Sequence, residues 1–286
     1  MNEIGIMQGR LSPAVPGRLQ AFPWSTWEKE FCHAATCGFE VIEWLFEADR
    51  YEQNPIWTQD GVQRIRQKMA TTGIRLRSLC ADYFMVHPFF RVSEPERTQS
   101  IAVLNRLILQ AAGVGIKTIL LPVLEGAGIR ADTEKIQLLD ALCEPLSLAI
   151  RHGIRLGLET ELPAAEYRAL VERGNHPALG VYFDTGNAVA KGHDIAAEIR
   201  VLGPFLCGIH IKDRTCGGPS VLLGQGDADF TSFFQAMGET AYIGPLVLET
   251  PSGNDFLALA GTHLKYVREY CNQAPAEVNS VRQVSR

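Results

Sequence analysis

The chain has 286 residues, of which 46% are hydrophobic and 21% charged, the composition of a globular protein with a large apolar core. Its net charge of −5 gives no basic surface of the kind that binds nucleic acid, and no apolar run of ~18 or more residues offers a membrane span. Seven cysteines without a C-x-x-C pair, and an N-terminus without a basic-then-apolar leader, predict a reducing, cytoplasmic location.

Strand-like and helix-like segments alternate along the chain. The strand candidates are short apolar runs, and several of the helix candidates end at a glycine. The strand candidates, in chain order, are 3–7, 41–46, 74–81, 117–123, 155–160, 180–187, 208–213 and 245–250. The helix candidates that follow them in turn are 25–37, 58–72, 93–113, 132–152, 164–173, 195–202, 230–237 and 255–270.

Eight strand-then-helix units in a chain of this length predict an α/β fold, a single-domain (β/α)8 TIM barrel with parallel strands. The alternative, an open doubly wound sheet, needs a glycine-rich nucleotide fingerprint after its first strand, and MQGRLSP at 7–13 is not one. We expect the barrel to occupy residues 1–272 and the polar stretch 273–286 to form a loose C-terminal tail.

The last four strand candidates each carry one metal-ligating side chain near the carboxyl end, namely Glu159, Asp184, His210 and Glu249. Side chains alternate along a strand, so the polar residue can face the barrel axis while its aliphatic neighbours face the helices. The carboxyl ends of barrel strands meet at one mouth, where the four side chains would converge. Any one of them alone is as often a salt-bridged or capping group. As a set of buried carboxylates with an imidazole they predict a divalent-metal site, for which Mn²⁺ or Mg²⁺ is favoured and Zn²⁺, Co²⁺ and Fe²⁺ are alternatives.

These segments resemble the sugar phosphate isomerase/epimerase family of xylose-isomerase-like barrels, which includes ketose 3-epimerases and hexulose-phosphate epimerases. The similarity runs from IGIMQGRL (4–11) to PLVLET (245–250) and includes IHIKD (209–213) followed by LGQGDADF (223–230). The resemblance implies that the same four residues bind one divalent cation and that the two glutamates among them act as an acid/base pair. It specifies the site better than the substrate, because one barrel scaffold hosts several reactions.

Such a site suits proton transfer beside a carbonyl group. A metal that holds the carbonyl and a neighbouring hydroxyl of a keto-sugar or sugar phosphate acidifies the adjacent C–H and stabilises an enediolate. We expect Glu159 to act as base and Glu249 as conjugate acid, with the roles reversing with the substrate. Return of the proton to the opposite face of the same carbon gives epimerisation, and return to the neighbouring carbon gives isomerisation. Loss of a β-hydroxyl instead makes a dehydratase of the inosose or dehydroshikimate type the alternative.

Six further polar residues are candidates for substrate binding, and each also has a structural interpretation such as a salt bridge. They are Gln8, Arg10, Glu43, His87, Asn187 and Lys212.

Three of these candidates have specific expected partners. Arg10 suits a phosphate or carboxylate or a loop carboxylate, and Glu43 suits a substrate hydroxyl, a neighbouring ligand or a salt bridge. Lys212 shares the inward face with His210, so it suits a substrate oxygen or pairs with Asp213 or another acid at this mouth.

The glycines of the loop at 223–230 have two interpretations. Backbone N–H groups in such loops bind phosphate in many barrels. The loop equally suits a simple turn before Asp229, which is placed to cap the next helix.

One position departs from the family pattern. Several relatives carry a histidine three residues after the sixth-strand aspartate, where this chain has Asn187. The multi-zinc endonuclease branch of the superfamily needs a histidine-rich cluster, which Asn187 and the lack of a D-x-H motif after His210 leave incomplete. DNA is therefore not an expected partner. A non-catalytic sugar-binding barrel would not need two opposed carboxylates. Dimers are common among the relatives, which leaves a homodimer open.

Overall fold

Eight parallel strands close into a barrel in the computed structural model, which describes residues 2–15, 17–18 and 20–273. The barrel closes because the first strand pairs in parallel with the second strand on one side and with the last strand on the other. Going round the barrel, the order is β1, β10, β7, β6, β5, β4, β3, β2. The barrel strands are β1 (Ile4–Met7), β2 (Val41–Leu45), β3 (Arg75–Cys80), β4 (Thr118–Val123), β5 (Arg155–Thr160), β6 (Leu179–Asp184), β7 (Leu206–Ile211) and β10 (Leu246–Leu248).

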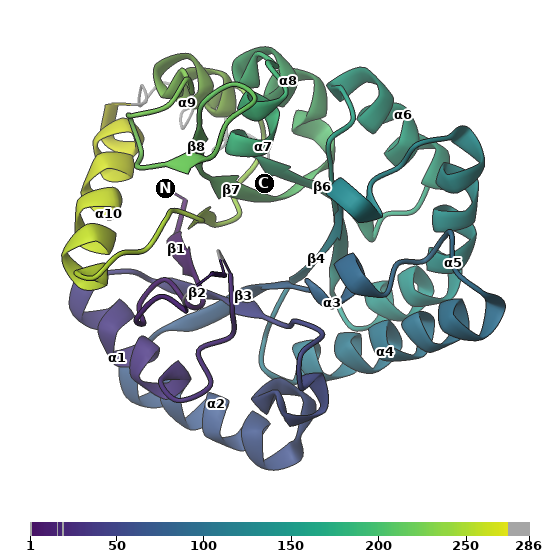
Figure 1. Ribbon diagram of the computed structural model, residues 1–286, viewed down its shortest axis with the longest axis horizontal. Coiled ribbons are helices and arrows are strands. Elements are labelled where there is room, and N and C mark those ends of the chain that lie inside the picture. The colour runs from purple at the N-terminus through teal and green to yellow at the C-terminus, as the bar shows by residue number, and fades with distance from the viewer. Residues whose placement is uncertain (1, 16, 19, 274–286) are drawn as a thin grey trace, which may run out of the picture.

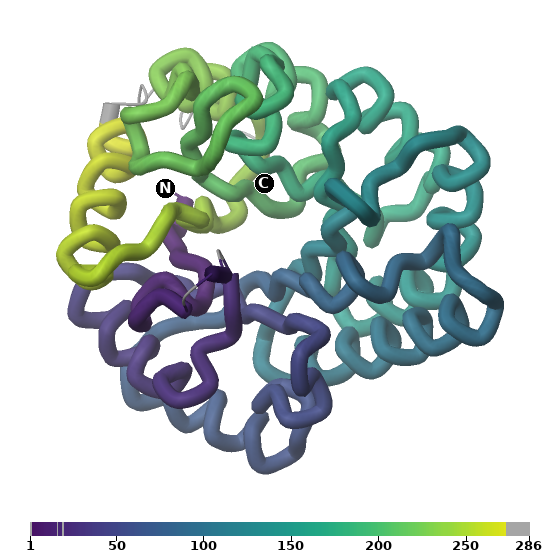
Figure 2. Tube along the Cα trace, in the orientation of Figure 1, coloured from purple at the N-terminus to yellow at the C-terminus, as the bar shows by residue number. Residues whose placement is uncertain are grey.

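A ring of helices surrounds the barrel, one following each strand (Figure 1). The chain circles the axis once, so that its first and last described elements lie side by side (Figure 2). This confirms the predicted (β/α)8 barrel. Of the tail expected at 273–286, Gln273 ends the last helix and residues 274–286 lie outside the described residues. The outer helices are α1 (Trp27–Cys37), α2 (Gln59–Thr72), α4 (Glu94–Gly113), α5 (Asp132–Arg151), α6 (Ala164–Gly174), α8 (Ile195–Leu202), α9 (Phe230–Gly238) and α10 (Phe256–Gln273).

Several short elements lie in the loops between the strands and the outer helices. The segment predicted as a strand at 180–187 is a strand only as far as Asp184, because that side chain accepts a hydrogen bond of 2.8 Å from the Asn187 backbone N–H and starts a helix. The short helices are α3 (Tyr83–Val86) and α7 (Thr185–Ala190), a two-stranded ribbon joins β8 (Asp213–Arg214) to β9 (Ser220–Val221), and 3₁₀ turns span Tyr51–Gln53, Pro55–Trp57, Glu125–Ala127 and Gly203–Phe205.

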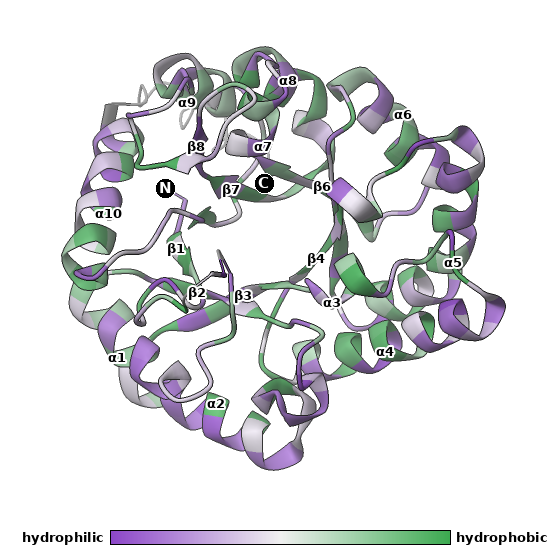
Figure 3. Ribbon diagram, viewed as in Figure 1, coloured by the Kyte–Doolittle hydropathy of each residue, from purple (hydrophilic) through white to green (hydrophobic). Residues whose placement is uncertain are grey.

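Apolar residues fill the layer between barrel and helices. Hydrophobic colour follows the strands and alternates with hydrophilic colour around the helices (Figure 3). Because strand residues alternate in direction, the aliphatic neighbours of the predicted ligands pack into this layer while the ligands face the axis. The fully buried aliphatic neighbours are Leu156, Leu158, Ile209, Ile211, Leu246 and Leu248.

The barrel interior is crossed by one aromatic side chain, Tyr182 of β6, which is 1% exposed. Gly208 on the adjacent strand β7 leaves the space for it, since a Cβ atom there would lie 2.1 Å from Tyr182 Cε2. The hydroxyl of Tyr182 reaches across the axis and donates a hydrogen bond to Glu43 of β2. Because the glycine at 208 has no side chain, Tyr182 of β6 can reach Glu43 of β2 on the opposite wall of the barrel.

Candidate metal centre

Four side chains converge at the carboxyl ends of neighbouring strands. Glu159 lies on β5, Asp184 ends β6, His210 lies on β7 and Glu249 directly follows β10. All four residues are buried, and one potential ligand atom from each lies within 4.8 Å of all the others. The structure therefore brings together the set of residues that the strand pattern selects.

Two of the ligand atoms are left without hydrogen bonds by the described residues. Oδ2 of Asp184 and Nδ1 of His210 are both buried and lack a hydrogen-bond partner, although they lie only 3.7 Å apart. His210 Nδ1 also lies 3.1 Å from Glu249 Oε2, in an orientation that makes no hydrogen bond. Buried polar atoms are nearly always partnered in native proteins. Three carboxylates and an imidazole with unsatisfied atoms aimed at one another fit a divalent cation between them.

Glu43 contacts the opposite side of the histidine ring. Its Oε1 lies 2.6 Å from His210 Nε2, and its Oε2 accepts the hydroxyl hydrogen of Tyr182. Since a carboxylate accepts only, the proton of a neutral His210 belongs on Nε2, and the lone pair of Nδ1 then faces the cluster. Carboxylates commonly orient metal-binding histidines in this way. The partners predicted for Glu43 were a substrate hydroxyl, a neighbouring ligand or a salt bridge. In the structure Glu43 contacts His210, one of the predicted ligands.

Two cations offset the charge of the carboxylates. Lys212 Nζ lies 3.0 Å from Glu249 Oε1 and 3.6 Å from Asp184 Oδ2. Burial opposes the charged ammonium, but the Asp184 and Glu249 carboxylates outweigh it and raise the pKa of Lys212. Arg10 NH2 lies 3.6 Å from Glu249 Oε1. The predicted pairing of Lys212 with Asp213 or another acid at this mouth is thus confirmed for another acid, Glu249, and not for Asp213.

Asn187 contacts Glu159, the other glutamate of the four-residue cluster. Its Nδ2 donates a 2.9 Å hydrogen bond to Glu159 Oε1, and its Oδ1 accepts one of 3.3 Å from Arg214 NH1. Arg214 is itself fixed, because its Nε and NH2 both donate to the Gly218 carbonyl. The Asn187 amide therefore has a defined orientation with its NH₂ group toward Glu159.

The surroundings of the two glutamates shift their pKa values in opposite directions. Burial raises the pKa of Glu159 well above its usual value, and the Asp184 carboxylate adds to the effect. Burial also acts to raise the pKa of Glu249, but the nearby cations, Lys212 first and Arg10 after it, help to hold that pKa well below its usual range. A bound cation would change both values. Neighbouring carboxyls in unlike environments are nevertheless the pattern of an acid/base pair.

The glycine loop after β7 is organised by an internal carboxylate. Asp213 is fully buried, and it accepts backbone hydrogen bonds of 2.8 Å from Gly224, 3.0 Å from Gly226 and 3.2 Å from Ala228. These three amides are directed at Asp213, so the loop does not present them to a phosphate. The simple-turn interpretation is confirmed, as is the cap, since Asp229 accepts from the Ser232 backbone N–H.

Two other candidates have different surroundings. Gln8 is buried, and its Oε1 accepts a 3.1 Å hydrogen bond from the Leu45 backbone N–H on β2. Its Nε2 is buried and has no partner among the described residues. His87 has an exposed side chain that stacks on Tyr83 with a ring separation of 4.4 Å. None of the hydrogen bonds or ion pairs found in the described chain joins His87 to the four-residue cluster.

Some site residues were missed by sequence reasoning. Tyr182 lies two positions before Asp184, so the two-residue period of the strand places it on the same inward face and could have identified it. Asp82 follows β3 and accepts hydrogen bonds of 2.6 Å from Gln20 Nε2 and 3.1 Å from Cys80 Sγ, while Gln20 Oε1 accepts one of 3.3 Å from Arg10 NH2. The contact of Gln20 with Asp82 joins loops that are distant in sequence, so it left no sequence signal.

A closed barrel with a buried Glu-Asp-His-Glu cluster at its mouth defines the class of this protein as a barrel of the xylose isomerase type. The model of the family described as "Xylose isomerase-like TIM barrel" matches residues 31–270, and the chain belongs to this family. Within the described part of the chain, none of the helices has the length and apolar character needed to span a bilayer.

Known relatives of the chain are sugar epimerases. Over 231 residues it is 26% identical to the L-ribulose-5-phosphate 3-epimerase UlaE of Salmonella heidelberg (strain SL476), a match that covers 78% of this chain and 81% of that protein. A solved L-ribulose 3-epimerase superposes with a TM-score of 0.79 over 100% of both chains at 18% identity. The D-allulose 3-epimerase from Methylomonas sp. in complex with D-allulose gives 0.73 at 18% identity, with 94% of this chain and 97% of that chain covered. At such identities the two structures show a shared fold.

Proposed function

We propose that this protein is a metal-dependent epimerase or isomerase that acts on a keto-sugar or a sugar phosphate. The observation that carries the proposal is the buried cluster, in which two glutamates flank an aspartate and a histidine. Going round the barrel, Glu159 on β5 is separated from Glu249 after β10 by β6 and β7. Carboxylates on different sides of one site can exchange protons with different faces of a substrate carbon.

Glu159, Asp184, His210 and Glu249 would hold the cation, for which the oxygen-rich donor set favours Mn²⁺ or Mg²⁺ over Zn²⁺, Co²⁺ or Fe²⁺. When bound, such a cation polarises the substrate carbonyl and stabilises negative charge that develops on its oxygen.

The chain's own residues supply proton transfer and orientation. In the order expected from the sequence, Glu159, held by Asn187, takes the proton from the carbon beside the carbonyl and Glu249, held by Lys212, returns one from the other side. The raised pKa of Glu159 and the lowered pKa of Glu249 favour the opposite order, in which Glu249 is the base and Glu159 gives up its own proton. The opposite epimer exchanges the two roles. The remaining candidates for substrate contacts are Gln8, Arg10 and His87, while Glu43 would act through His210. A cytoplasmic location, a homodimer and the lack of a nucleic-acid partner stay predictions.

The test combines metal analysis with a solvent deuterium exchange screen over free and phosphorylated ketoses. Incorporation of one deuterium beside the carbonyl, dependent on added metal, is the expected result. Glu159→Gln and Glu249→Gln should each abolish turnover even where some metal stays bound. Absence of exchange from every ketose in metal-loaded protein would contradict the proposal, and the absorbance of a conjugated enone or diketone product would favour the dehydratase instead.

A further inference from the structure

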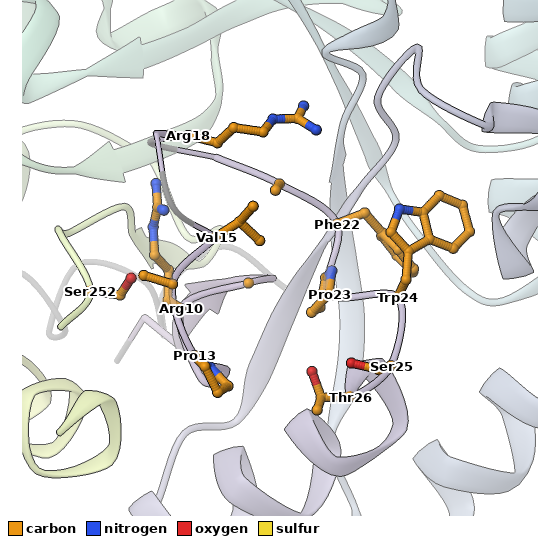
Figure 4. A pocket seen from close by; sticks show the side chains of 13 residues that line it. Arg10, Pro13, Val15, Arg18, Phe22, Pro23, Trp24, Ser25, Thr26 and Ser252 are labelled. Carbon is orange, nitrogen blue, oxygen red and sulfur yellow. The ribbon is translucent and has the colours of Figure 1, made fainter. Parts of the chain in front are cut away.

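A separate pocket lies within the loop that joins β1 to α1. Its cavity volume is about 270 Å³. Two limbs of the loop face each other across it, with Arg10, Pro13 and Val15 on one side and Phe22 and Trp24 on the other (Figure 4). Ser252, from the loop between β10 and α10, closes one edge.

The pocket is cationic although the neighbouring metal centre is rich in carboxylates. The charged side chains that line it are Arg10 and Arg18, and none of its lining residues is acidic. Hydroxyl groups of Ser25, Thr26 and Ser252 add polar atoms to the wall. Two guanidinium groups with nearby hydroxyls suit a phosphate, which guanidinium binds through paired N–H donors.

Hydrogen bonds hold the two limbs of the pocket in place. The Glu47 carboxylate binds Arg18 NH2 with one oxygen and accepts a 2.8 Å hydrogen bond from the Phe22 backbone N–H with the other. Arg18 has five N–H donors, more than one carboxylate oxygen can use. Arg18, whose side chain is 45% exposed, therefore has N–H donors to offer an anion.

Arg10 lies between the pocket and the metal centre. This side chain is 5% exposed, lines the pocket, and places NH2 3.6 Å from Glu249 Oε1 in the cluster. Ser252 follows Glu249 by three residues in the sequence. A ligand with its reacting end at the cluster would therefore have its distal end directed toward Arg10 and Arg18.

We propose that this pocket binds a phosphate ester at the distal end of the ketose, so that the substrate is a phosphorylated sugar. This inference rests on the proposed function. A volume of about 270 Å³ is below the range of roughly 300–1,000 Å³ typical of complete ligand sites. The size therefore suits the end of a substrate rather than an independent cofactor.

The test uses two variants and a matched control in the full-length, metal-loaded protein. Arg18→Gln removes one cation and Ser252→Asp adds an anion to the wall. Lys29→Gln makes the same charge change as Arg18→Gln at an exposed position of α1 that does not line the pocket. Deuterium exchange is measured for a ketose phosphate and for the same ketose without phosphate, with inorganic phosphate as a competitor.

The expected result is a loss of roughly tenfold or more in kcat/KM for the ketose phosphate in each pocket variant, because a charged hydrogen bond to the phosphate is lost or opposed. Exchange from the free ketose should change by less than about twofold, and Lys29→Gln should match the wild type on both substrates. Inorganic phosphate should compete with the ketose phosphate. It should also raise the Tm of the wild type but not of Ser252→Asp.

Three outcomes would overturn the subsite while leaving the proposed function intact. They are equal use of free and phosphorylated ketose, losses in the pocket variants no larger than in Lys29→Gln, and inhibition by inorganic phosphate that is not competitive. Failure of every ketose to exchange deuterium would instead overturn the proposed function. The Tm measurement needs no turnover, so it separates anion binding at the pocket from catalysis at the cluster.

Discussion

Replacing Glu43 by Gln should weaken divalent-metal binding although Glu43 is not itself one of the four proposed ligands. The carboxylate accepts hydrogen bonds from both His210 Nε2 and the Tyr182 hydroxyl. A glutamine side chain has one acceptor oxygen and one donor NH₂ group, so it cannot accept from both partners. The NH₂ group either opposes the His210 Nε2–H donor or faces the Tyr182 hydroxyl, which must then accept and turn its own hydrogen elsewhere. Either change occurs in a place where Glu43 is 0% and His210 1% exposed.

The size of the effect follows from these contacts. The carboxylate fixes the ring of His210 with Nδ1 toward the cluster, and losing such an outer partner typically weakens metal affinity by roughly 10–100-fold. That range corresponds to about 1.4–2.8 kcal/mol, in line with the ~1.5–3 kcal/mol of a hydrogen bond to a charged group. Tyr182→Phe removes one donor and leaves the His210 contact, so it should cost less, on the order of 1 kcal/mol.

Titration calorimetry with Mn²⁺ measures the affinities, and the visible spectrum of the Co²⁺ protein reports on ligand geometry without turnover. Circular dichroism and thermal unfolding check that each variant is folded. Binding by Glu43→Gln within about twofold of the wild type, with an unchanged Co²⁺ spectrum, would refute the reasoning that Glu43 orients His210.

Further predictions concern stability. Gly208→Ala would place Cβ 2.1 Å from the Tyr182 ring and should cost roughly 1–3 kcal/mol of unfolding free energy in urea titrations; an unchanged midpoint would contradict this packing. Burial raises the pKa of Glu30 from its ordinary 4.5 to about 7. Between these values the unfolded chain releases a proton that the folded chain keeps, so the unfolding free energy should fall by roughly 3 kcal/mol as pH rises. Glu30→Gln should flatten that slope in urea titrations, and equal slopes would be evidence against the shift. Asp213→Asn should weaken the hold on three loop amides and speed proteolysis between residues 214 and 228; unchanged cleavage would argue against this role.

The barrel and the four-residue cluster were predictable because both depend on periodicity. Eight alternating units imply the closed sheet, and the two-residue period of strands places Glu159 and His210 on inward faces. The contact of Glu43 with His210 was less accessible, because it depends on how strands from opposite walls meet inside the barrel. The contact of Tyr182 with Glu43 was also hard to foresee, because it depends on the space that Gly208 leaves for the Tyr182 ring.

Loop interactions account for most of what sequence could not supply. From the sequence, the glycines at 224 and 226 suited a phosphate site as well as a simple turn. In the structure their backbone N–H groups donate hydrogen bonds to Asp213. Lys212 suited its neighbour Asp213 but contacts Glu249 instead. It directly follows β7, and the buried Asp213 carboxylate is occupied by the amides of the glycine loop. The cationic pocket combines side chains from two loops at opposite ends of the sequence, a proximity that only barrel closure creates.

The contact of Tyr182 and Glu43 across the barrel axis has a consequence for assembly. All four proposed ligands come from the second half of the chain, from β5 onward, whereas Glu43 lies on β2. A fragment holding β5 to β10 would contain every ligand yet lack the group that orients the histidine. High-affinity metal binding would then appear late in folding, once the two halves have joined, and would serve as a probe of complete barrel closure.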